Sequence, residues 1–487
     1  MYMNHTLESV NGVFIQGKEA QDTEIKNLYN PARTNEKVGE VKTGTVSHVQ
    51  QAVEAADKTW AIWRETSIEE RAQYLVEAAN YIESNLDTFS RLLVMEHGKI
   101  LKEAQMDLKA AAGVLRYYGG LTDVLDEKTV ENQQGTMVLT RQPVGVVSVI
   151  VPWNYPIILS FLMLAPSLLA GNTVVIKPPT FVPMTLTKFL KHVSAQLPDG
   201  VLNVVLGSGS TVGKEMVEHP RVRKVAFTGS TDTGRTIMRG AAETIKKVSM
   251  ELGGNDAAII LKDMPITNEL IQECIQSTFA SCGQICYSIK RIYIHRDNYQ
   301  DFVDKFTDEA SKFVVGFGLD PDIDMGPINN KPQYDSIMEL LERTKRTGAS
   351  VKEVGVMSDH VSKSDGYFIL PTIVTNVRTT DPIVQEEQFG PVIPIIPFDT
   401  EEEVIDLVND SEFGLTNSVW TKDVDYGFKL GRQLQSGSVF VNTHRIGASA
   451  ANMPFGGFKQ SGIGRGHGVE AVHEHTELQA LIRRTDM

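Results

Sequence analysis

Cysteine is scarce in this chain of 487 residues, which contains only three. So few cysteines cannot form the disulfide framework of secreted domains, and a reducing compartment, the cytoplasm, is therefore expected. Long apolar runs are also missing. The longest, residues 157–170, contains Pro166 and two serines and is shorter than the roughly 20 apolar residues of a transmembrane helix. The sequence thus predicts a buried helix there and no membrane span.

An excess of positive charge is missing as well. The chain has 47 basic and 61 acidic residues, and its formal net charge is −14 at pH 7. Nucleic acid and anionic membranes are therefore not expected as partners. The 11 histidines show no spacing typical of metal ligands, so no metal site is predicted. The first 25 residues carry scattered charges and lack the apolar stretch of a signal peptide.

What the chain does contain is a regular alternation of strands and helices. Its length allows two or three domains, each with its own core. Helices are expected at 157–170 and 183–196, and strands at 146–151, 173–177, 201–206, 225–228 and 248–251. This alternation predicts a parallel, doubly wound α/β sheet that binds ligands at the carboxyl ends of its strands. The residues that follow those ends are Asn154, Lys177, Gly207, Gly229 and Glu251.

Other segments flank this sheet. Residues 46–122 show the apolar periodicity of three helices, the last of them ending near Gly119. Residues 136–140 alternate and are rich in β-branched side chains, which predicts a strand. A second α/β domain is expected over residues 255–445, with helices near 298–314, 332–347 and 400–409 and strands at 257–261, 291–295, 350–354 and 392–398.

Cys286 lies in the stretch that offers the clearest chemistry. It follows Gly283-Gln284-Ile285 and precedes Lys290 and Arg291. The thiolate is the reactive form of cysteine, and positive charge nearby lowers its pKa. If this stretch is considered without the rest of the chain, Cys286 could equally be a buried, inert cysteine. Glu251 as a base and Asn154 as an oxyanion donor would complete a site for acyl transfer through a thioester.

These motifs together resemble the aldehyde dehydrogenase superfamily. They occur in the family's order over nearly the whole chain, at residues 29–32, 152–156, 227–235, 251–254, 279–291, 386–392 and 454–462. The resemblance implies that Cys286 attacks an aldehyde, that Asn154 and the Cys286 backbone N–H bind the oxyanion, and that Glu251 activates water to release the acid. An inactive structural homologue and a coenzyme-A-acylating enzyme are the alternatives, but both normally lack one of these three groups.

The resemblance also implies how the chain is divided. An α/β, aldehyde dehydrogenase-like fold would place a Rossmann-type dinucleotide-binding domain at residues 1–122 and 143–253 and a catalytic domain at residues 254–453. Residues 123–142 and 469–487 would form a β arm that pairs with a neighbouring subunit, giving a homodimer or homotetramer. A plain hairpin at 123–142 is the alternative reading.

NAD or NADP is the implied cofactor. Gly229 permits a tight turn before a helix whose free N–H groups favour a pyrophosphate, although such a turn can also bind nothing. Many NAD-preferring members carry glutamate where this chain has Thr180. A carboxylate would repel a 2′-phosphate and threonine would not, so NADP is expected to be tolerated or preferred. The implied contacts are Trp153, Lys177, Thr180, Gly207, Gly229, Ser230, Glu387 and Phe389.

A small polar aldehyde such as lactaldehyde or glycolaldehyde is the expected substrate. Amino aldehydes such as betaine aldehyde and semialdehydes such as succinate semialdehyde remain alternatives, and Arg445 could either bind an acidic substrate or be solvated or paired at an interface.

Two positions depart from the family pattern, since Asn255 and Gly466 replace a common lysine and a common glutamate. Cys282 could form a reversible disulfide with Cys286 or be a small buried residue. The implied pocket residues are Tyr155, Ile158, Ile285, Tyr287, His444 and Phe455.

Overall fold

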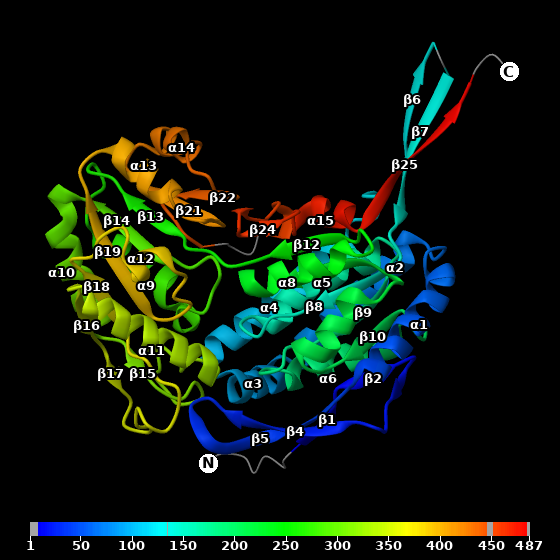
Figure 1. The fold of residues 1–487 in the computed structure, drawn as a ribbon, viewed down its shortest axis with the longest axis horizontal. Coiled ribbons are helices and arrows are strands. Elements are labelled where there is room, and N and C mark those ends of the chain that lie inside the picture. The colour runs from blue at the N-terminus through cyan, green and yellow to red at the C-terminus, as the bar shows by residue number, and fades with distance from the viewer. Residues whose placement is uncertain (1–7, 134, 446–450, 485–487) are drawn as a thin grey trace.

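The computed structural model describes residues 8–133, 135–445 and 451–484. Two lobes lie side by side, one around an eight-stranded sheet and the other around a seven-stranded sheet (Figure 1). A third, three-stranded sheet projects from the first lobe into solvent (Figure 1). No helix in the described ranges is both long and apolar enough to cross a membrane.

The eight-stranded sheet has the strand order β24-β12-β11-β8-β9-β10-β2-β3. Its five central strands are parallel, and the predicted alternation is present. All residues of β8, β9 and β10 are buried, as expected for strands covered by helices on both faces. The strands are β2 (Val13–Ile15), β3 (Lys18–Glu19), β8 (Val146–Ile150), β9 (Thr173–Lys177), β10 (Leu202–Val205), β11 (Val222–Thr228), β12 (Lys247–Glu251) and β24 (Gly462–Ile463).

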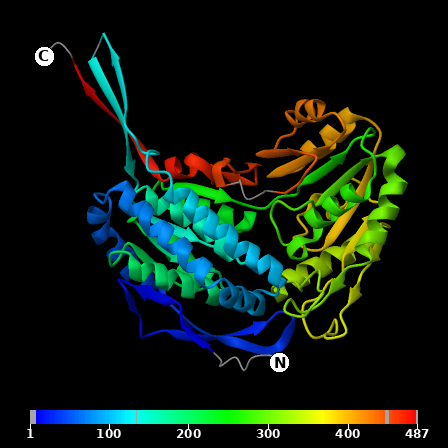
Figure 2. The same ribbon diagram turned by 180° about the vertical axis from the view of Figure 1, so that it is seen from behind.

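Helices cover this sheet, and the reverse view shows those of the N-terminal part running beside one another across the lobe (Figure 2). Four helices, not the three expected, occupy residues 46–119, because Gly98 adopts a left-handed conformation (φ 93°) and ends α3. The helices are α1 (Val46–Trp63), α2 (Ile68–Ser84), α3 (Leu86–His97), α4 (Leu101–Gly119), α5 (Pro156–Leu169), α6 (Met184–Gln196), η1 (Gly209–Gly213), α7 (Lys214–Glu218) and α8 (Thr231–Ala242).

The seven-stranded sheet has the strand order β16-β18-β19-β14-β13-β21-β22. Sequence reasoning missed β18, β21 and β22. In β21 the signal is weak because Thr416, Asn417 and Ser418 are polar, although all three are buried. The strands are β13 (Ala257–Ile260), β14 (Arg291–His295), β16 (Ser350–Glu353), β18 (Thr372–Thr375), β19 (Val392–Phe398), β21 (Thr416–Trp420) and β22 (Ser438–Val441).

Helices and short strands complete this second lobe and the C-terminal part of the chain. The helices are α9 (Asn268–Phe279), η2 (Ala280–Gly283), η3 (Arg296–Asn298), α10 (Tyr299–Ala310), α11 (Lys331–Arg346), α12 (Pro382–Gln385), α13 (Glu401–Asn409), α14 (Val424–Gly431) and α15 (Gly468–Glu474). The short strands are β15 (Val314–Val315), β17 (Val356–Met357), β20 (Phe413–Gly414) and β23 (Phe458–Lys459).

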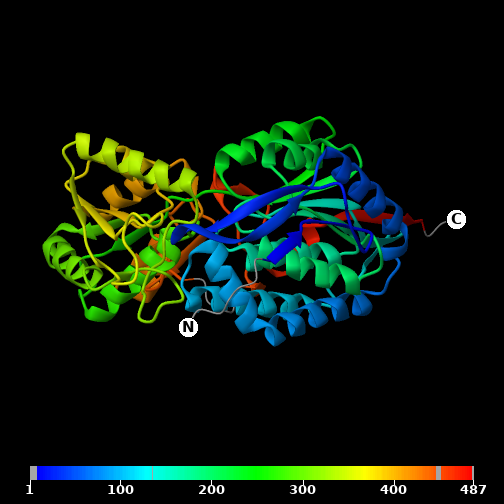
Figure 3. The same cartoon turned by 90° about the horizontal axis from the view of Figure 1, so that it is seen from below.

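Two small sheets lie at opposite edges of the first lobe. Strands β1 (Glu8–Asn11), β4 (Glu24–Asn30) and β5 (Arg33–Thr43) form one, which runs along the lobe in the view from below (Figure 3). The projecting sheet consists of β6 (Lys128–Asn132), β7 (Gly135–Pro143) and β25 (Thr476–Arg483). The expected arm segment at residues 469–487 thus begins in helix α15 before it reaches strand β25.

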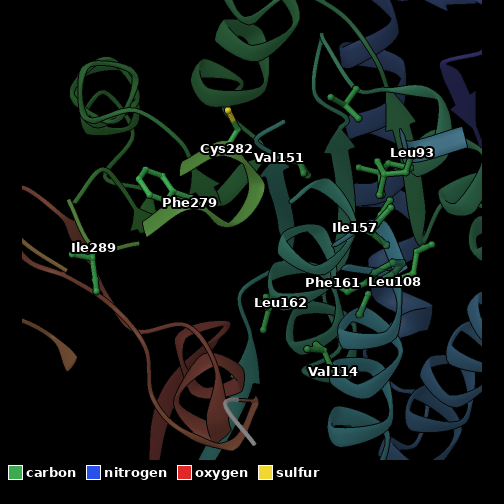
Figure 4. Close-up of a cluster of buried hydrophobic side chains, with 14 of the residues drawn as sticks. Leu93, Leu108, Val114, Val151, Ile157, Phe161, Leu162, Phe279, Cys282 and Ile289 are labelled. Atoms are coloured by element: carbon green, nitrogen blue, oxygen red, sulfur yellow. The ribbon is translucent and has the colours of Figure 1, made fainter. Parts of the chain in front are cut away.

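One large cluster of buried apolar side chains extends through both lobes. Figure 4 shows part of it, with Leu93, Ile157 and Phe161 from the first lobe and Phe279 and Cys282 from the second. Because the core is shared, the loops that face each other between the lobes have fixed positions.

Candidate active site

Cys286 follows a loop with an unusual backbone. Ser281, Cys282 and Gly283 have φ values of 52°, 59° and 69°, a left-handed run that is costly for residues with a side chain. A Cβ atom at Gly283 would lie 2.2 Å from the Gly390 carbonyl oxygen, so only glycine fits there. The loop therefore packs directly on the backbone of residue 390. Cys286 is partly exposed, whereas Cys282 is buried.

Asn154 reaches this loop from the other lobe. It follows β8, is 5% exposed, and donates a hydrogen bond from Nδ2 to the Gln284 carbonyl oxygen at 3.0 Å. That acceptor is two residues before Cys286. An amide nitrogen has two hydrogens, so a second N–H remains to donate into the space beside the thiol.

Three charged side chains at the start of α4 hold both of these loops, and we call them the α4 charge cluster: Lys99, Glu103 and Asp107. Lys99 Nζ donates to the Asn154 carbonyl oxygen at 2.8 Å and lies 3.4 Å from Asp107 Oδ2. Glu103 Oε1 accepts from the Ser281 N–H at 2.6 Å. Burial raises the pKa of both carboxyls and lowers that of Lys99. One helix thus positions residues from both lobes.

Glu251 ends β12 and points toward Gly466. Its Oε2 is buried and has no hydrogen-bond partner within the described ranges, and a Cβ atom at Gly466 would lie 3.7 Å from its Oε1. Burial raises the pKa of Glu251 well above the usual value, which the Arg465 charge and the Gly466 N–H only partly offset. Because residue 466 is glycine, it places no acidic side chain beside this carboxyl.

Acidic groups surround the thiol. Burial, followed by the charges of Glu387, Asp256 and Glu251, raises the pKa of Cys286, while Lys290 opposes them. Lys290 is buried and donates from Nζ to the Gly283 carbonyl oxygen at 2.9 Å. Burial and the acidic neighbours thus favour the protonated thiol, and Lys290 is the nearby cation that favours the thiolate.

Glu387 and Phe389 lie on the far side of the cysteine loop. Glu387 Oε1 accepts from the Gly254 N–H at 3.2 Å, and burial raises the pKa of Glu387 to about 7. Phe389 packs edge-on against Trp153, with ring centroids 5.6 Å apart, and lies 5.0 Å from Lys290 Nζ. The expected contacts Trp153, Glu387 and Phe389 are thus close neighbours of Cys286.

The other expected cofactor residues lie at the carboxyl ends of the parallel strands. Lys177 Nζ contacts two carbonyl oxygens, those of Pro178 at 3.1 Å and Gly207 at 3.5 Å, and burial lowers the pKa of Lys177 to about 8. The Thr180 hydroxyl donates to the same Gly207 oxygen at 3.5 Å. Ser230 caps α8 directly after Gly229. An unneutralised ammonium, a hydroxyl and a helix start fit a phosphate-bearing dinucleotide.

Aromatic rings lie around the approach to Cys286. Tyr287 and Phe455 pack edge-on, with centroids 6.1 Å apart, and Lys99 Nζ lies 3.7 Å from the Tyr155 ring centroid. Ile285 is buried beside the thiol. His444 is 1% exposed and uses both ring nitrogens, on the Ser418 hydroxyl at 2.8 Å and the Tyr287 carbonyl at 3.0 Å. His444 thus supports Tyr287 and has no nitrogen left for a substrate.

The cationic candidate Arg445 is also occupied. It forms a two-pronged ion pair with Glu273 and bonds Gln276 at 2.7 Å, so the solvated or paired alternative describes it better than a substrate contact. The described residues contain no group of three or more histidine, cysteine, aspartate or glutamate side chains that could hold a metal ion.

The sequence of the chain from residue 18 to residue 481 matches the model of the aldehyde dehydrogenase family. The chain belongs to this family. It is accordingly an oxidoreductase, and the resemblance inferred from its motifs is confirmed.

Three relatives show the breadth of the family around this aldehyde dehydrogenase. A phenylacetaldehyde dehydrogenase of Pseudomonas fluorescens is 34% identical over 500 residues, covering 99% of this chain and 98% of its own. The NAD⁺ complex of a Bacillus cereus aldehyde dehydrogenase superimposes with a TM-score of 0.92 at 34% identity, over 98% of this chain and 96% of that one. An Escherichia coli NADP-dependent enzyme gives a TM-score of 0.92 at 32% identity, over 97% and 98%.

Sequence reasoning missed the α4 charge cluster and one further residue of this aldehyde dehydrogenase. For the α4 charge cluster a signal existed: Glu103 and Asp107 are one turn apart and share the face of the buried Ala104 and Leu108. Charged residues on an apolar helix face are seldom solvated. The further residue is Lys26 of β4, which contacts Thr180 and which no local pattern distinguishes from an exposed strand lysine.

Proposed function

We propose that this chain oxidises a small uncharged aldehyde to the carboxylic acid with NAD⁺ or NADP⁺, using Cys286 as nucleophile, Asn154 as oxyanion donor and Glu251 as base. The hydrogen bond that joins Asn154 to the cysteine loop carries this proposal, because it brings an amide donor from one lobe beside the thiol of the other. A thiol, an adjacent amide and a buried, unpaired carboxyl are what acyl transfer through sulfur requires.

The first step joins sulfur to the aldehyde carbon. Cys286 gives its proton to water and attacks, and the carbonyl oxygen becomes an oxyanion in a thiohemiacetal. The free N–H of the Asn154 side chain and the backbone N–H of Cys286 stabilise that charge, and Lys290 favours the thiolate. The α4 charge cluster fixes Asn154 before substrate arrives, so little reorganisation is needed during the reaction.

Cofactor contacts are proposed along the strand ends. Lys177, Thr180 and Gly207 would hold the adenosine half, Gly229 and Ser230 the pyrophosphate, and Glu387, Phe389 and Trp153 the nicotinamide half. When bound there, the cofactor would supply the hydride acceptor for the carbon bonded to sulfur. With Thr180 in place of a carboxylate, nothing at this position repels a 2′-phosphate.

Glu251 then completes turnover. Its carboxylate takes a proton from water, the resulting hydroxide adds to the thioester, and the thiolate leaves as the acid forms. The raised pKa of Glu251 makes its carboxylate more basic, which suits a general base. Since no carboxyl side chain stands at position 466, protons would leave Glu251 through water toward solvent.

An uncharged substrate follows from the pocket. Tyr155, Tyr287, Phe455 and Ile285 offer aromatic and apolar walls with two hydroxyls, while His444 and Arg445 are bonded within the protein. No described cation is therefore free to bind an acidic substrate there. Hydroxyaldehydes such as lactaldehyde and glycolaldehyde are our first choice, because tyrosine hydroxyls can bond to their alcohol group.

An arylacetaldehyde is the second candidate. The edge-on pair of Tyr287 and Phe455 could receive an aromatic ring, and the Pseudomonas relative bears the name phenylacetaldehyde dehydrogenase. Ring–ring contacts favour this class, whereas the tyrosine hydroxyls favour the first.

We also propose how the protein assembles and how the chain is divided into domains, from its similarity to the aldehyde dehydrogenase family. Leu478, Leu481 and Ile482 on β25 are 60%, 49% and 74% exposed, with Leu478 and Ile482 on one face of the strand and Leu481 on the other. Pairing between subunits would cover such apolar side chains. We infer a homodimer or homotetramer that uses residues 123–142 and 469–487. The dinucleotide-binding part would be residues 1–122 and 143–253, and the catalytic part residues 254–453.

Reduced-cofactor absorbance tests the whole proposal. Wild-type protein is mixed with lactaldehyde, glycolaldehyde, phenylacetaldehyde, betaine aldehyde and succinate semialdehyde, each with NAD⁺ and with NADP⁺. We expect turnover with uncharged aldehydes and formation of the acid without added coenzyme A. Activity that requires coenzyme A, or that is greatest with succinate semialdehyde, would contradict the assigned chemistry or pocket.

A further inference from the structure

Lys26 comes from a part of the chain far from the strand ends, yet its side chain reaches them. It lies on β4, in the small sheet that runs along the first lobe (Figure 3). Its Nζ donates to the Thr180 carbonyl oxygen at 3.4 Å and lies 5.6 Å from the centroid of the Phe181 ring. The side chain is half-buried. It is thus held at the position that we assign to the adenosine ribose.

A second lysine stands beside it with the same charge. Lys177 is 5% exposed, and the positive charge of Lys26 contributes to the lowered pKa of Lys177. Across the part of the chain that the structure describes, neither ammonium forms an ion pair, and the hydrogen bonds of both go only to carbonyl oxygens. Two neighbouring cations removed from bulk water without a carboxylate are costly, and a bound anion would relieve the repulsion.

We propose that Lys26 is a ligand of the 2′-phosphate of NADP⁺, forming with Lys177 and Thr180 a site that makes NADP⁺ the preferred cofactor. The inference rests on the proposed function, since it requires the adenosine ribose to lie at Lys177. It goes further in naming a residue from the N-terminal sheet as the one that separates the two cofactors.

The chemistry matches the two positions. A phosphate ester carries nearly two negative charges and three acceptor oxygens, whereas the 2′-hydroxyl of NAD⁺ carries no charge. Lys177 lies deeper and contacts the Gly207 carbonyl, so it can serve either cofactor. Lys26 is the more exposed of the two and donates to the Thr180 carbonyl oxygen, so its ammonium contributes mainly to the cofactor with the extra phosphate.

A purely structural role predicts something different. If Lys26 only ties β4 to residues 180–181, its loss would lower stability and weaken both cofactors alike. Lys37 of the neighbouring strand β5 provides the matched control, because it is a partly exposed lysine that pairs with Glu40 at 2.6 Å and is not bonded to the strand ends.

The experiment compares wild type, Lys26→Met, Lys26→Glu and the control Lys37→Met. Calorimetry measures binding of 2′,5′-ADP and 5′-ADP, and kinetics gives kcat/KM for NADP⁺ and NAD⁺. We expect Lys26→Met to weaken the binding of 2′,5′-ADP by about tenfold and to lower kcat/KM for NADP⁺ by the same factor. This is the usual effect of losing one charged contact. Lys26→Glu should lower both the affinity for 2′,5′-ADP and kcat/KM for NADP⁺ further. In both Lys26 variants, the affinity for 5′-ADP and kcat/KM for NAD⁺ should stay within about twofold of wild type. In Lys37→Met, all four values should stay within that range.

The proposal would be overturned if Lys26→Met weakened the binding of 2′,5′-ADP and of 5′-ADP equally, or if it changed the binding of neither. The outcome is separable from that of the proposed function. If no aldehyde were oxidised by wild type, the reaction would be wrong, yet selective loss of 2′,5′-ADP binding would still support the phosphate site. If aldehydes were oxidised with an NADP⁺/NAD⁺ ratio unaffected by Lys26, only the assignment of Lys26 would fail.

Discussion

The catalytic end of the site and its adenosine end are built in opposite ways. At the catalytic end, Asn154 and the loop before Cys286 are fixed by buried hydrogen bonds of 2.6–3.0 Å from the α4 charge cluster and from each other. At the adenosine end, Lys26, Lys177 and Thr180 make only contacts of 3.1–3.5 Å to carbonyl oxygens. Bond making needs groups placed to within a fraction of an ångström, whereas phosphate recognition needs mainly charge. Variants at the first end should therefore change kcat, and variants at the second should change cofactor choice.

Cys286→Ala should have the largest effect and abolish turnover, because the covalent step has no substitute. Reduced-cofactor absorbance at saturating aldehyde is the measurement. Cys282→Ala is the matched control, since Cys282 is buried in the core four residues away. It should lower the melting temperature and leave turnover within a few-fold of wild type. Substantial turnover by Cys286→Ala would remove the basis of the catalytic assignment.

Glu251→Gln should come next, with kcat reduced by roughly 10²–10⁴, because amide cannot act as the base that activates water. Oxidation would still occur once per site, so a rapid burst of reduced cofactor should precede the slow steady state. Stopped-flow absorbance detects the burst, and mass spectrometry detects the acyl group on Cys286.

The dependence of kcat on pH provides a second test of Glu251 as the base. Because its pKa is raised, the carboxyl is protonated at low pH and gains base character as the pH increases. Wild-type kcat should thus increase with pH, and Glu251→Gln should lose that dependence. A Glu251→Gln enzyme with normal kcat would show that another group deacylates.

Asn154→Ala should reduce kcat by roughly 10²–10³, the usual cost of one oxyanion donor, with a smaller change in KM. Steady-state kinetics measures both. Asn172→Ala is the control, since Asn172 is another buried asparagine that bonds Gly145, Ser167 and His475 away from the thiol. It should cost stability and spare the rate per folded molecule. Equal loss of kcat in the two variants would argue that Asn154 is only structural.

Glu103→Ala tests whether the α4 charge cluster gives the catalytic end its fixed geometry. Without an acceptor for the Ser281 N–H, the left-handed loop should relax, and a small displacement of Cys286 should cost about 10- to 100-fold in kcat. KM for the cofactor should stay close to normal. Alkylation of Cys286 by iodoacetamide provides a second readout of thiol position.

Glu103→Gln is the informative partner of that variant. It keeps an acceptor for Ser281 while removing the charge, so most of the rate should return. A Gln variant as slow as the Ala variant would mean that the charge, and not the hydrogen bond, matters.

Thr180→Glu should have the smallest effect on kcat and act only at the adenosine end. A carboxylate beside the 2′-position should lower the NADP⁺/NAD⁺ ratio of kcat/KM by about tenfold or more, through repulsion of the phosphate. Thr180→Val, which removes the hydroxyl without adding charge, should stay near the wild-type ratio. If Thr180→Glu reduced kcat as strongly as Asn154→Ala, the two ends would not be separable as argued.

Much of the fold and of the catalytic end could be predicted because local signals agreed. Strands β8, β9 and β10 are buried and mostly apolar. Lys177 and Glu251 end β9 and β12, and Asn154 and Gly229 come shortly after β8 and β11. The strand β21 escaped because its buried polar residues are satisfied by distant partners, such as Asp256 for Thr416. Lys26 could not be assigned for the same physical reason, whereas the helix face of Glu103 marked that carboxyl as buried without indicating its partner. Their partners, Thr180 and Ser281, are more than 150 residues away along the chain.

The missing side chain at Gly283 has a consequence for how this enzyme could change its substrate. Its backbone touches that of Gly390, so the spacing between the cysteine loop and the loop of Glu387 and Phe389 is set by main-chain atoms. Side-chain replacements around the pocket leave that spacing intact. New aldehydes could therefore be accommodated at Tyr155, Tyr287 or Phe455 while the reacting groups keep their alignment, and catalytic geometry and substrate range can evolve independently.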